Sequence, residues 1–383
     1  MKHLLSLQRF LVSIASQPWF AYFATLSIWG LTLASRVMYN GFVYGFDYGL
    51  FQPDGSLYTF RALLFAGYTE ELAGRKVADW YGKHSLETEF TGPDLYYENN
   101  SFLWDQYMTR VLYPLLSTPF VMLFGVPGML VVPSTTYLFT LLVSTRIAVR
   151  LGSPVIGWVV ALLVTSSTSI ARWMFANITD GLLLLFVSLF ILLISGSQGL
   201  RLSKPKLAIL VVLISLSAVT RFSAFFWFGV ALVLFIHRRY SNSLLVFITA
   251  VLSHIPIFMR PFSGHVLPEH NDKSFGEKLL IYPLNLLRVT LFEFGQLFVL
   301  DRVLFLLIAL GILISLKYIC EIPSQLFLIS TVALMITGSI NGVLGVNFRY
   351  QLPLVPVLLY LLVHSAAKIY QKRKFAPLDT SPN

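Results

Sequence analysis

The chain has 383 residues, of which 56% are hydrophobic and 12% charged, and its mean hydropathy is +0.73. Because soluble domains carry about 25% charged residues, this composition excludes a soluble globular protein and predicts an all-α polytopic membrane protein. The net charge of +10 lies in short segments between apolar runs rather than in one patch, so we expect topology signals and no nucleic-acid partner.

Apolar runs recur along nearly the whole chain, and they are long enough to cross a hydrocarbon core about 30 Å thick. We predict a single transmembrane domain over residues 1–383, with about ten transmembrane helices. No small-residue cleavage site follows the first span, so we expect a retained helix rather than a signal peptide. The predicted spans are residues 21–39, 127–149, 154–175, 181–197, 207–220, 222–236, 244–259, 303–316, 325–340 and 350–367.

The charges between these spans predict the orientation of the chain. The inside segments carry fourteen basic and two acidic residues, and the outside holds the remaining fourteen basic and sixteen acidic residues. The positive-inside rule therefore predicts a multi-pass membrane protein with both termini in the cytoplasm. We expect the bacterial inner membrane as its location. Cys320 is the only cysteine of the sequence, which excludes a disulfide framework or a thiolate metal cluster within the chain.

Two outer segments are too long to be simple connections. Residues 40–126 form a first outer loop rich in tryptophan and tyrosine, which favours juxtamembrane helices at the membrane–water interface. Residues 260–302 form a second outer loop, whose apolar stretch 279–300 could be an eleventh span. An interfacial helix is favoured, because an eleventh span would place the basic tail outside. Its polar residues also fall within about 140° of one another around a helix; they are Asn285, Arg288, Glu293 and Gln296.

The first outer loop begins with two carboxylates, Asp47 and Asp54. The sequence Pro53-Asp54-Gly55 predicts a turn, which would hold the Asp54 carboxylate at a fixed position near the membrane surface. A base there could accept the proton of an acceptor hydroxyl, as glycosyl transfer requires. The alternative is a solvated turn aspartate without a chemical role.

Asp180 opens the fourth span, and Arg172 precedes it on the same side of the membrane. Asp180 could hold a hydroxyl or a cation beside the first-loop aspartate, or could simply complement the positive end of its own helix. Arg172 could take part in the same site or snorkel at the membrane edge. No cofactor is required by this pattern, although a divalent cation could bind. The histidines and acids of residues 264–272 lack a helix to group them, so we expect a polar loop there.

Arg221 and Arg349 lie at the outer ends of apolar spans, where ionisable residues are costly and often functional. A fixed guanidinium stabilises the negative charge that develops on a lipid-phosphate leaving group. Snorkelling to the interface is the alternative for both residues.

The order of these features resembles the GT-C superfamily of polytopic glycosyltransferases. An early outer-loop aspartate is followed by a Tyr-Pro juxtamembrane stretch, a span ending in arginine and a short outer Arg…Asp loop. The matching segments are Asp54-Gly55-x-x-Tyr58 with Arg61 and Gly67-Tyr68, Arg110-Val111-Leu112-Tyr113-Pro114-Leu115, Arg146-x-x-x-Arg150, Arg172 through Thr179-Asp180-Gly181, and Phe348-Arg349-Tyr350-Gln351-Leu352-Pro353-Leu354-Val355-Pro356.

This resemblance implies an inverting hexosyl or pentosyl transferase of the cell envelope, with a polyprenyl-phosphate sugar donor and a glycan or lipid acceptor, working at the outer face of the membrane. It implies Asp54 or Asp47 as the catalytic base. The substrate-binding candidates are Arg349, Arg221, Asp180, Arg172, Tyr58, Arg61 and Arg110. The sequence lacks a paired Asp-Glu and a His-Pro-Asp-Glu run. A lipid or glycolipid transporter or flippase, or a non-catalytic GT-C-like assembly subunit, remains an alternative.

Overall fold

The computed structural model describes residues 13–43, 50–51, 53–84, 110–152, 154–176, 178–196, 200–258, 275–341 and 349–375. Every regular element in these ranges is helical, and none of the described residues forms a β-strand. The prediction of an all-α fold is therefore confirmed.

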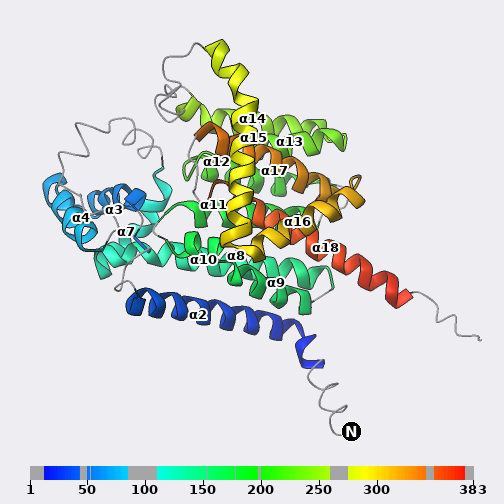
Figure 1. Cartoon of the computed structure of the whole chain (residues 1–383), viewed down its shortest axis with the longest axis horizontal. Helices are drawn as coiled ribbons and strands as arrows, with labels where there is room; N and C mark the ends of the chain where they lie inside the picture. Colours follow the sequence, from blue (N-terminus) through cyan, green and yellow to red (C-terminus); the bar gives the residue numbers. More distant parts are fainter. Residues whose placement is uncertain are drawn as a thin grey trace, which may run out of the picture.

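The predicted spans fall largely on helical segments of the main bundle (Figure 1), and the span predicted at 154–175 covers two helices, α9 and α10. The bundle helices are α2 (Pro18–Val43), α8 (Val131–Arg150), α9 (Pro154–Ser166), α10 (Thr168–Phe175), α11 (Asp180–Ser195), α12 (Lys204–Ala218), α13 (Ala224–Ile236), α14 (Tyr240–Phe258), α16 (Arg302–Lys317), α17 (Ile322–Asn341) and α18 (Leu354–Phe375).

The core of the bundle forms around α11, whose sequence is apolar on all sides and whose residues are mostly buried. Helix α8 packs against α11 and α2, and α18 packs against α11 and α17. A hydrogen bond of 2.8 Å between the hydroxyls of Thr25 and Thr145 joins α2 to α8. A helix that is hydrophobic all round is buried by its neighbours, which is what the position of α11 shows.

The expectation of one continuous helix over residues 154–175 is wrong. Helices α9 and α10 meet at 82°, with the break at Ser167. The Ser167 hydroxyl accepts a hydrogen bond from the Ile170 amide at 3.1 Å and so caps α10. The break lies in a run of five hydroxyl residues, 165–169. Such side chains compete for backbone hydrogen bonds and favour helix caps over helix interiors.

One buried carboxylate fixes this break. Asp301 is 3% exposed and accepts hydrogen bonds from the Ser167 hydroxyl at 2.6 Å and the Ser169 amide at 2.8 Å. Its other oxygen accepts from the Leu304 amide at 3.1 Å, at the start of α16. A single side chain thus caps two helices that are far apart in the sequence.

Length and composition single out few of these helices as membrane spans on their own. Within the described part of the chain, Val126–Arg150 is the one continuous helical stretch that is both long and apolar enough. The bent pair of α9 and α10 makes a second when its halves are counted together. Shorter apolar helices include α11, α13 and α18, over the ranges Asp180–Ser195, Ala224–Ile236 and Leu354–Ile369.

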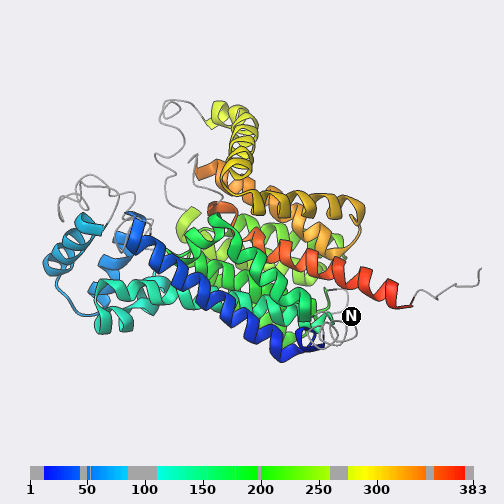
Figure 2. The same ribbon diagram turned by 60° about the horizontal axis from the view of Figure 1, so that its bottom comes forward.

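The helices of the first loop gather at one end of the bundle, which both views show (Figures 1 and 2). They are α3 (Pro53–Phe65), α4 (Glu70–His84) and α7 (Leu112–Phe124). The last part of the first loop forms one helix, α7, with Pro119 in its interior, followed by the short 3-10 helix η1 (Val126–Leu130). Pro114 does not break α7, because it lies in the first turn, where a missing amide has no helical partner to lose.

Helix α15 (Phe275–Leu300) runs across the direction of α2 and α18, as Figures 1 and 2 show. It packs against α16 and α17. Its expected polar face is divided, since Glu293 is buried and Arg288 is exposed.

Candidate functional site

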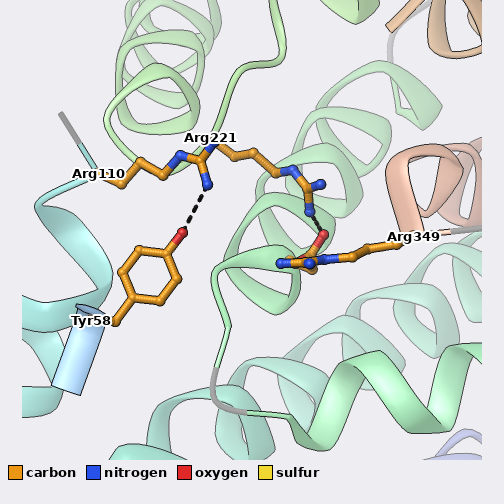
Figure 3. Close-up of polar contacts among 5 residues, drawn as sticks. Tyr58, Arg110, Arg221 and Arg349 are labelled. Atoms are coloured by element: carbon orange, nitrogen blue, oxygen red, sulfur yellow. Dashed lines mark hydrogen bonds and ion pairs between the residues drawn. The ribbon is translucent and has the colours of Figure 1, made fainter. Parts of the chain in front are cut away.

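Asp180 is the centre of the candidate site, and two predicted arginines converge on it. Its carboxylate is 3% exposed and forms ion pairs with Arg221 through Oδ1 and with Arg349 through Oδ2 (Figure 3). The distance from Arg349 Nε to Oδ2 is 3.2 Å. Asp180 begins α11, Arg221 lies between α12 and α13, and Arg349 begins the short helix η4 (Arg349–Gln351).

Trp173 links this group to a third arginine. The guanidinium carbons of Arg172 and Arg349 each lie 5.0 Å from the centre of its indole ring. Trp173 and Arg349 are buried, whereas Arg172 is exposed. We call Asp180, Arg172, Arg221, Arg349 and Trp173 the arginine cluster.

Two of the three guanidiniums in the arginine cluster pair with the Asp180 carboxylate. The faces of indole rings attract cations and hold Arg172 and Arg349 in place. Fixed guanidiniums bind phosphate or carboxylate groups through paired hydrogen bonds. The two ion pairs occupy both oxygens of the Asp180 carboxylate, so this residue orients the arginines and is a poor candidate for a general base.

The start of α11 fits closely against α8, which sets the position of Asp180. A Cβ atom at Gly181 would lie 2.8 Å from Thr136 Oγ1 on α8, closer than real side chains approach. Glycine therefore permits the close approach of the two helices. Asp180 also places its negative charge at the positive end of the α11 dipole.

The segment that carries Arg221 is held by His254 on α14. His254 Nε2 accepts a hydrogen bond from the Ser223 amide at 3.2 Å, and Nδ1 lies 2.8 Å from the Ala250 carbonyl. A backbone amide can only donate, so the imidazole is neutral with its proton on Nδ1. His254 is buried and fixes the turn beside Arg221.

A second pair of predicted residues lies on the neighbouring segment. Arg110 Nη1 donates a hydrogen bond of 2.9 Å to the Tyr58 hydroxyl, as Figure 3 shows. The Leu112 amide donates to the Val219 carbonyl at 3.4 Å, which ties the start of α7 to the segment that carries Arg221. Arg61, also on α3, is half-buried and lies over the ring of Phe65 at 5.3 Å.

Of the two candidate bases, only the backbone of Asp54 is described by the structure. Asp47 lies outside the described residues, as does the side chain of Asp54. The expected turn at Pro53-Asp54-Gly55 is instead the first turn of α3. Proline suits the first position of a helix, because its φ angle is already helical and its missing amide needs no partner. The Asp54 backbone therefore lies one helical turn before Tyr58.

Two buried oxygen atoms near Asp180 and Arg349 in the sequence lack hydrogen-bond partners among the described residues. They are Oγ1 of Thr179, which precedes Asp180, and Oε1 of Gln351, two residues after Arg349. Buried polar atoms are normally satisfied, so such atoms indicate room for a bound water or ligand group. The described residues contain no group of three or more His, Cys, Asp or Glu side chains that could hold a metal ion.

Sequence reasoning brought Asp180, Arg221, Arg349 and Arg172 into one candidate set, and the structure places them together. It missed Trp173, which it treated as an apolar residue of a continuous span. The adjacent Arg172-Trp173 pair was the available signal, since tryptophan is the preferred ring for a cation. No family model, curated protein or solved structure matches the chain.

Proposed function

We propose that the chain is a multi-pass membrane glycosyltransferase of GT-C type, located in the bacterial inner membrane with about ten transmembrane helices. It transfers a hexose or pentose, with inversion, from a polyprenyl-phosphate donor to a glycan or lipid acceptor at the outer face. The observation that carries the proposal is the convergence of Arg221 and Arg349 on Asp180, beside the helices of the first loop. The donor class and the inversion rest on the resemblance described above.

The arginine cluster suits the phosphate of such a donor. In the proposed reaction, the acceptor oxygen forms a bond to the anomeric carbon while the bond from that carbon to the phosphate oxygen breaks. The polyprenyl phosphate leaves with the electron pair, and its growing negative charge is stabilised by Arg349 and Arg221. Arg172, which is exposed and lies over the Trp173 ring, meets the donor first.

The acceptor proton passes to an aspartate of the first outer loop, Asp54 or Asp47. Asp54 is favoured by the position of its backbone at the start of α3, one turn before Tyr58. Tyr58 is bound by Arg110, whose segment is tied to that of Arg221. This chain of contacts supports a site in which base and phosphate-binding groups face the same substrate.

The proposal is tested by sugar transfer in membranes that contain the full chain and a panel of polyprenyl-phosphate sugars. Asp54→Asn and Asp47→Asn are compared, and the variant that removes the base is expected to lose about 100-fold or more in rate. Arg349→Lys keeps the positive charge but loses the bidentate hydrogen bonding of the guanidinium group, so we expect the rate of transfer to fall about 100-fold. Arg302→Lys, at an exposed arginine on α16, is the matched control.

Full transfer by both aspartate variants would exclude the proposed base. Transbilayer movement of the lipid donor without any transfer would favour the flippase alternative. Neither measurement depends on the identity of the acceptor, because release of polyprenyl phosphate from the donor can be followed directly.

A further inference from the structure

A pocket of about 710 Å³ lies at the opposite end of α11 from Asp180. Its wall includes Ile194, Ser195 and Gly196 at the end of α11, together with Glu321 and Lys368. At 1.5 Å per residue, the end of α11 lies about 20 Å from the arginine cluster, so the pocket is a separate site. In Figure 1 the last turns of α18, which carry Lys368, extend away from the helices of the first loop.

The polar wall of the pocket is organised around Glu321. Its carboxylate forms an ion pair with Lys368 through Oε1, and Oε2 lies 3.3 Å from His364 Nε2. Lys368 and Lys317 both lie over the ring of Tyr318, at 5.0 and 5.5 Å. The Tyr318 ring thus contacts two ammonium groups at this end of the bundle.

Two further cations stand at the end of α11. Arg150 Nη1 donates to the Leu192 carbonyl at 3.3 Å, and Lys206 Nζ donates to the Leu193 carbonyl at 3.4 Å. Basic side chains complement the negative end of a helix dipole. Among the residues that line the pocket, Glu321 is the one carboxylate. The basic side chains around the pocket therefore favour the binding of an anion. The Glu321 carboxylate occupies the position beside Lys368 that such an anion would take.

Apolar surface continues from this basic group. Leu316, Ile319 and Ile369 are exposed next to Lys317, Cys320 and Lys368. The remaining pocket wall is largely apolar, with Leu151, Ile322 and Pro323. A cationic group beside exposed aliphatic side chains matches a molecule with a negative head and hydrocarbon tails.

We propose that this pocket binds the phosphate headgroup of an anionic phospholipid of the inner leaflet, in competition with the Glu321 carboxylate. Lys368 and His364 contact the phosphate, and the acyl chains lie along Leu316, Ile319 and Ile369. The headgroup displaces Glu321 from Lys368 when it binds. Glu321 thus lowers the affinity of the site and makes it selective for a headgroup of sufficient charge.

The test uses the purified full chain in neutral detergent, titrated with short-chain phosphatidylglycerol and, separately, with short-chain phosphatidylcholine. We expect saturable binding of phosphatidylglycerol only. Lys368→Gln weakens it about fivefold, the effect of one basic residue on an anionic lipid surface. Glu321→Gln strengthens it by a similar factor, because the competing carboxylate is removed. Lys83→Gln, at an exposed lysine of α4 among the helices of the first loop, leaves the affinity unchanged.

The opposite signs of these two variants distinguish binding from a structural role. If Glu321 and Lys368 only hold the fold together, both variants weaken binding or neither changes it, and either result overturns the proposal. Equal competition by inorganic phosphate would overturn the lipid assignment in favour of a phosphate site. The measurement involves no sugar transfer, so its result is independent of the proposed glycosyltransferase activity.

Discussion

Asp180 and Arg349 are 169 positions apart in the chain, yet Arg349 Nε lies 3.2 Å from the Asp180 carboxylate. Both residues are buried, and Arg221 reaches the other oxygen of the same carboxylate. Two guanidiniums that would repel each other are therefore held together by one acid. The stability of this end of the bundle and the positions of both arginines therefore depend on the same side chain.

Asp180→Asn is expected to destabilise the protein more than Arg349→Gln. The first change leaves two guanidiniums buried without their carboxylate, whereas the second leaves the Asp180–Arg221 pair intact. Removing one partner of a buried pair costs about 3 to 5 kcal/mol. Unfolding free energies in mild detergent give the comparison, and equal losses in the two variants would contradict it.

Trp173→Leu is expected to weaken binding of the polyprenyl-phosphate donor while the fold is retained. The ring lies under the guanidiniums of both Arg172 and Arg349, and each such contact contributes about 0.5 to 2 kcal/mol. We expect the donor KM to rise about tenfold. Trp173→Phe keeps an aromatic face and should recover part of the loss. Trp19→Leu, at an exposed ring of α2, serves as the control.

Asp301→Ala is expected to cost about 3 kcal/mol in unfolding free energy, because it removes the acceptors that cap α10 and α16. Ser203→Ala is the matched control. Ser203 precedes α12 as its cap residue, but its side chain makes no capping hydrogen bond. Its replacement should cost much less. Urea or thermal unfolding measures both variants, and similar costs would argue against the double cap.

Gly181→Ala is expected to cost about 1 to 3 kcal/mol, because the new methyl group meets Thr136 Oγ1 at 2.8 Å. Thr136→Ala removes that oxygen. The double variant should therefore lose less unfolding free energy than the two single variants lose in total. Strict additivity in this cycle would show that α11 and α8 do not meet at Gly181.

The helices of the bundle could be predicted from the sequence because their signal is continuous hydrophobicity. The predicted span at residues 181–197 and the observed helix Asp180–Ser195 differ little at either end. The break between α9 and α10 was missed, because the hydroxyl residues 165–169 carry no charge and include no proline or glycine to mark it. Their capping partner, Asp301, lies more than a hundred positions away, and only the folded chain brings it near.

The residues of the candidate site could be predicted from the sequence, but their spatial arrangement could not. Charged residues at the ends of apolar runs are conspicuous, so Asp180, Arg221 and Arg349 could be selected individually. Their pairing depends on how α11, α12 and α18 pack, and no local pattern encodes it. His254 illustrates the limit most clearly, since its role rests on one backbone amide of another helix.

The order in which the arginine cluster enters the chain has a consequence for biosynthesis. Asp180 and Arg221 are made first, whereas Arg349 precedes only the last helix. While the chain is still emerging from the ribosome, Asp180 can be neutralised by Arg221 alone. Arg349 can join this pair only after most of the bundle has been made, so the two ion pairs on Asp180 are completed late in synthesis.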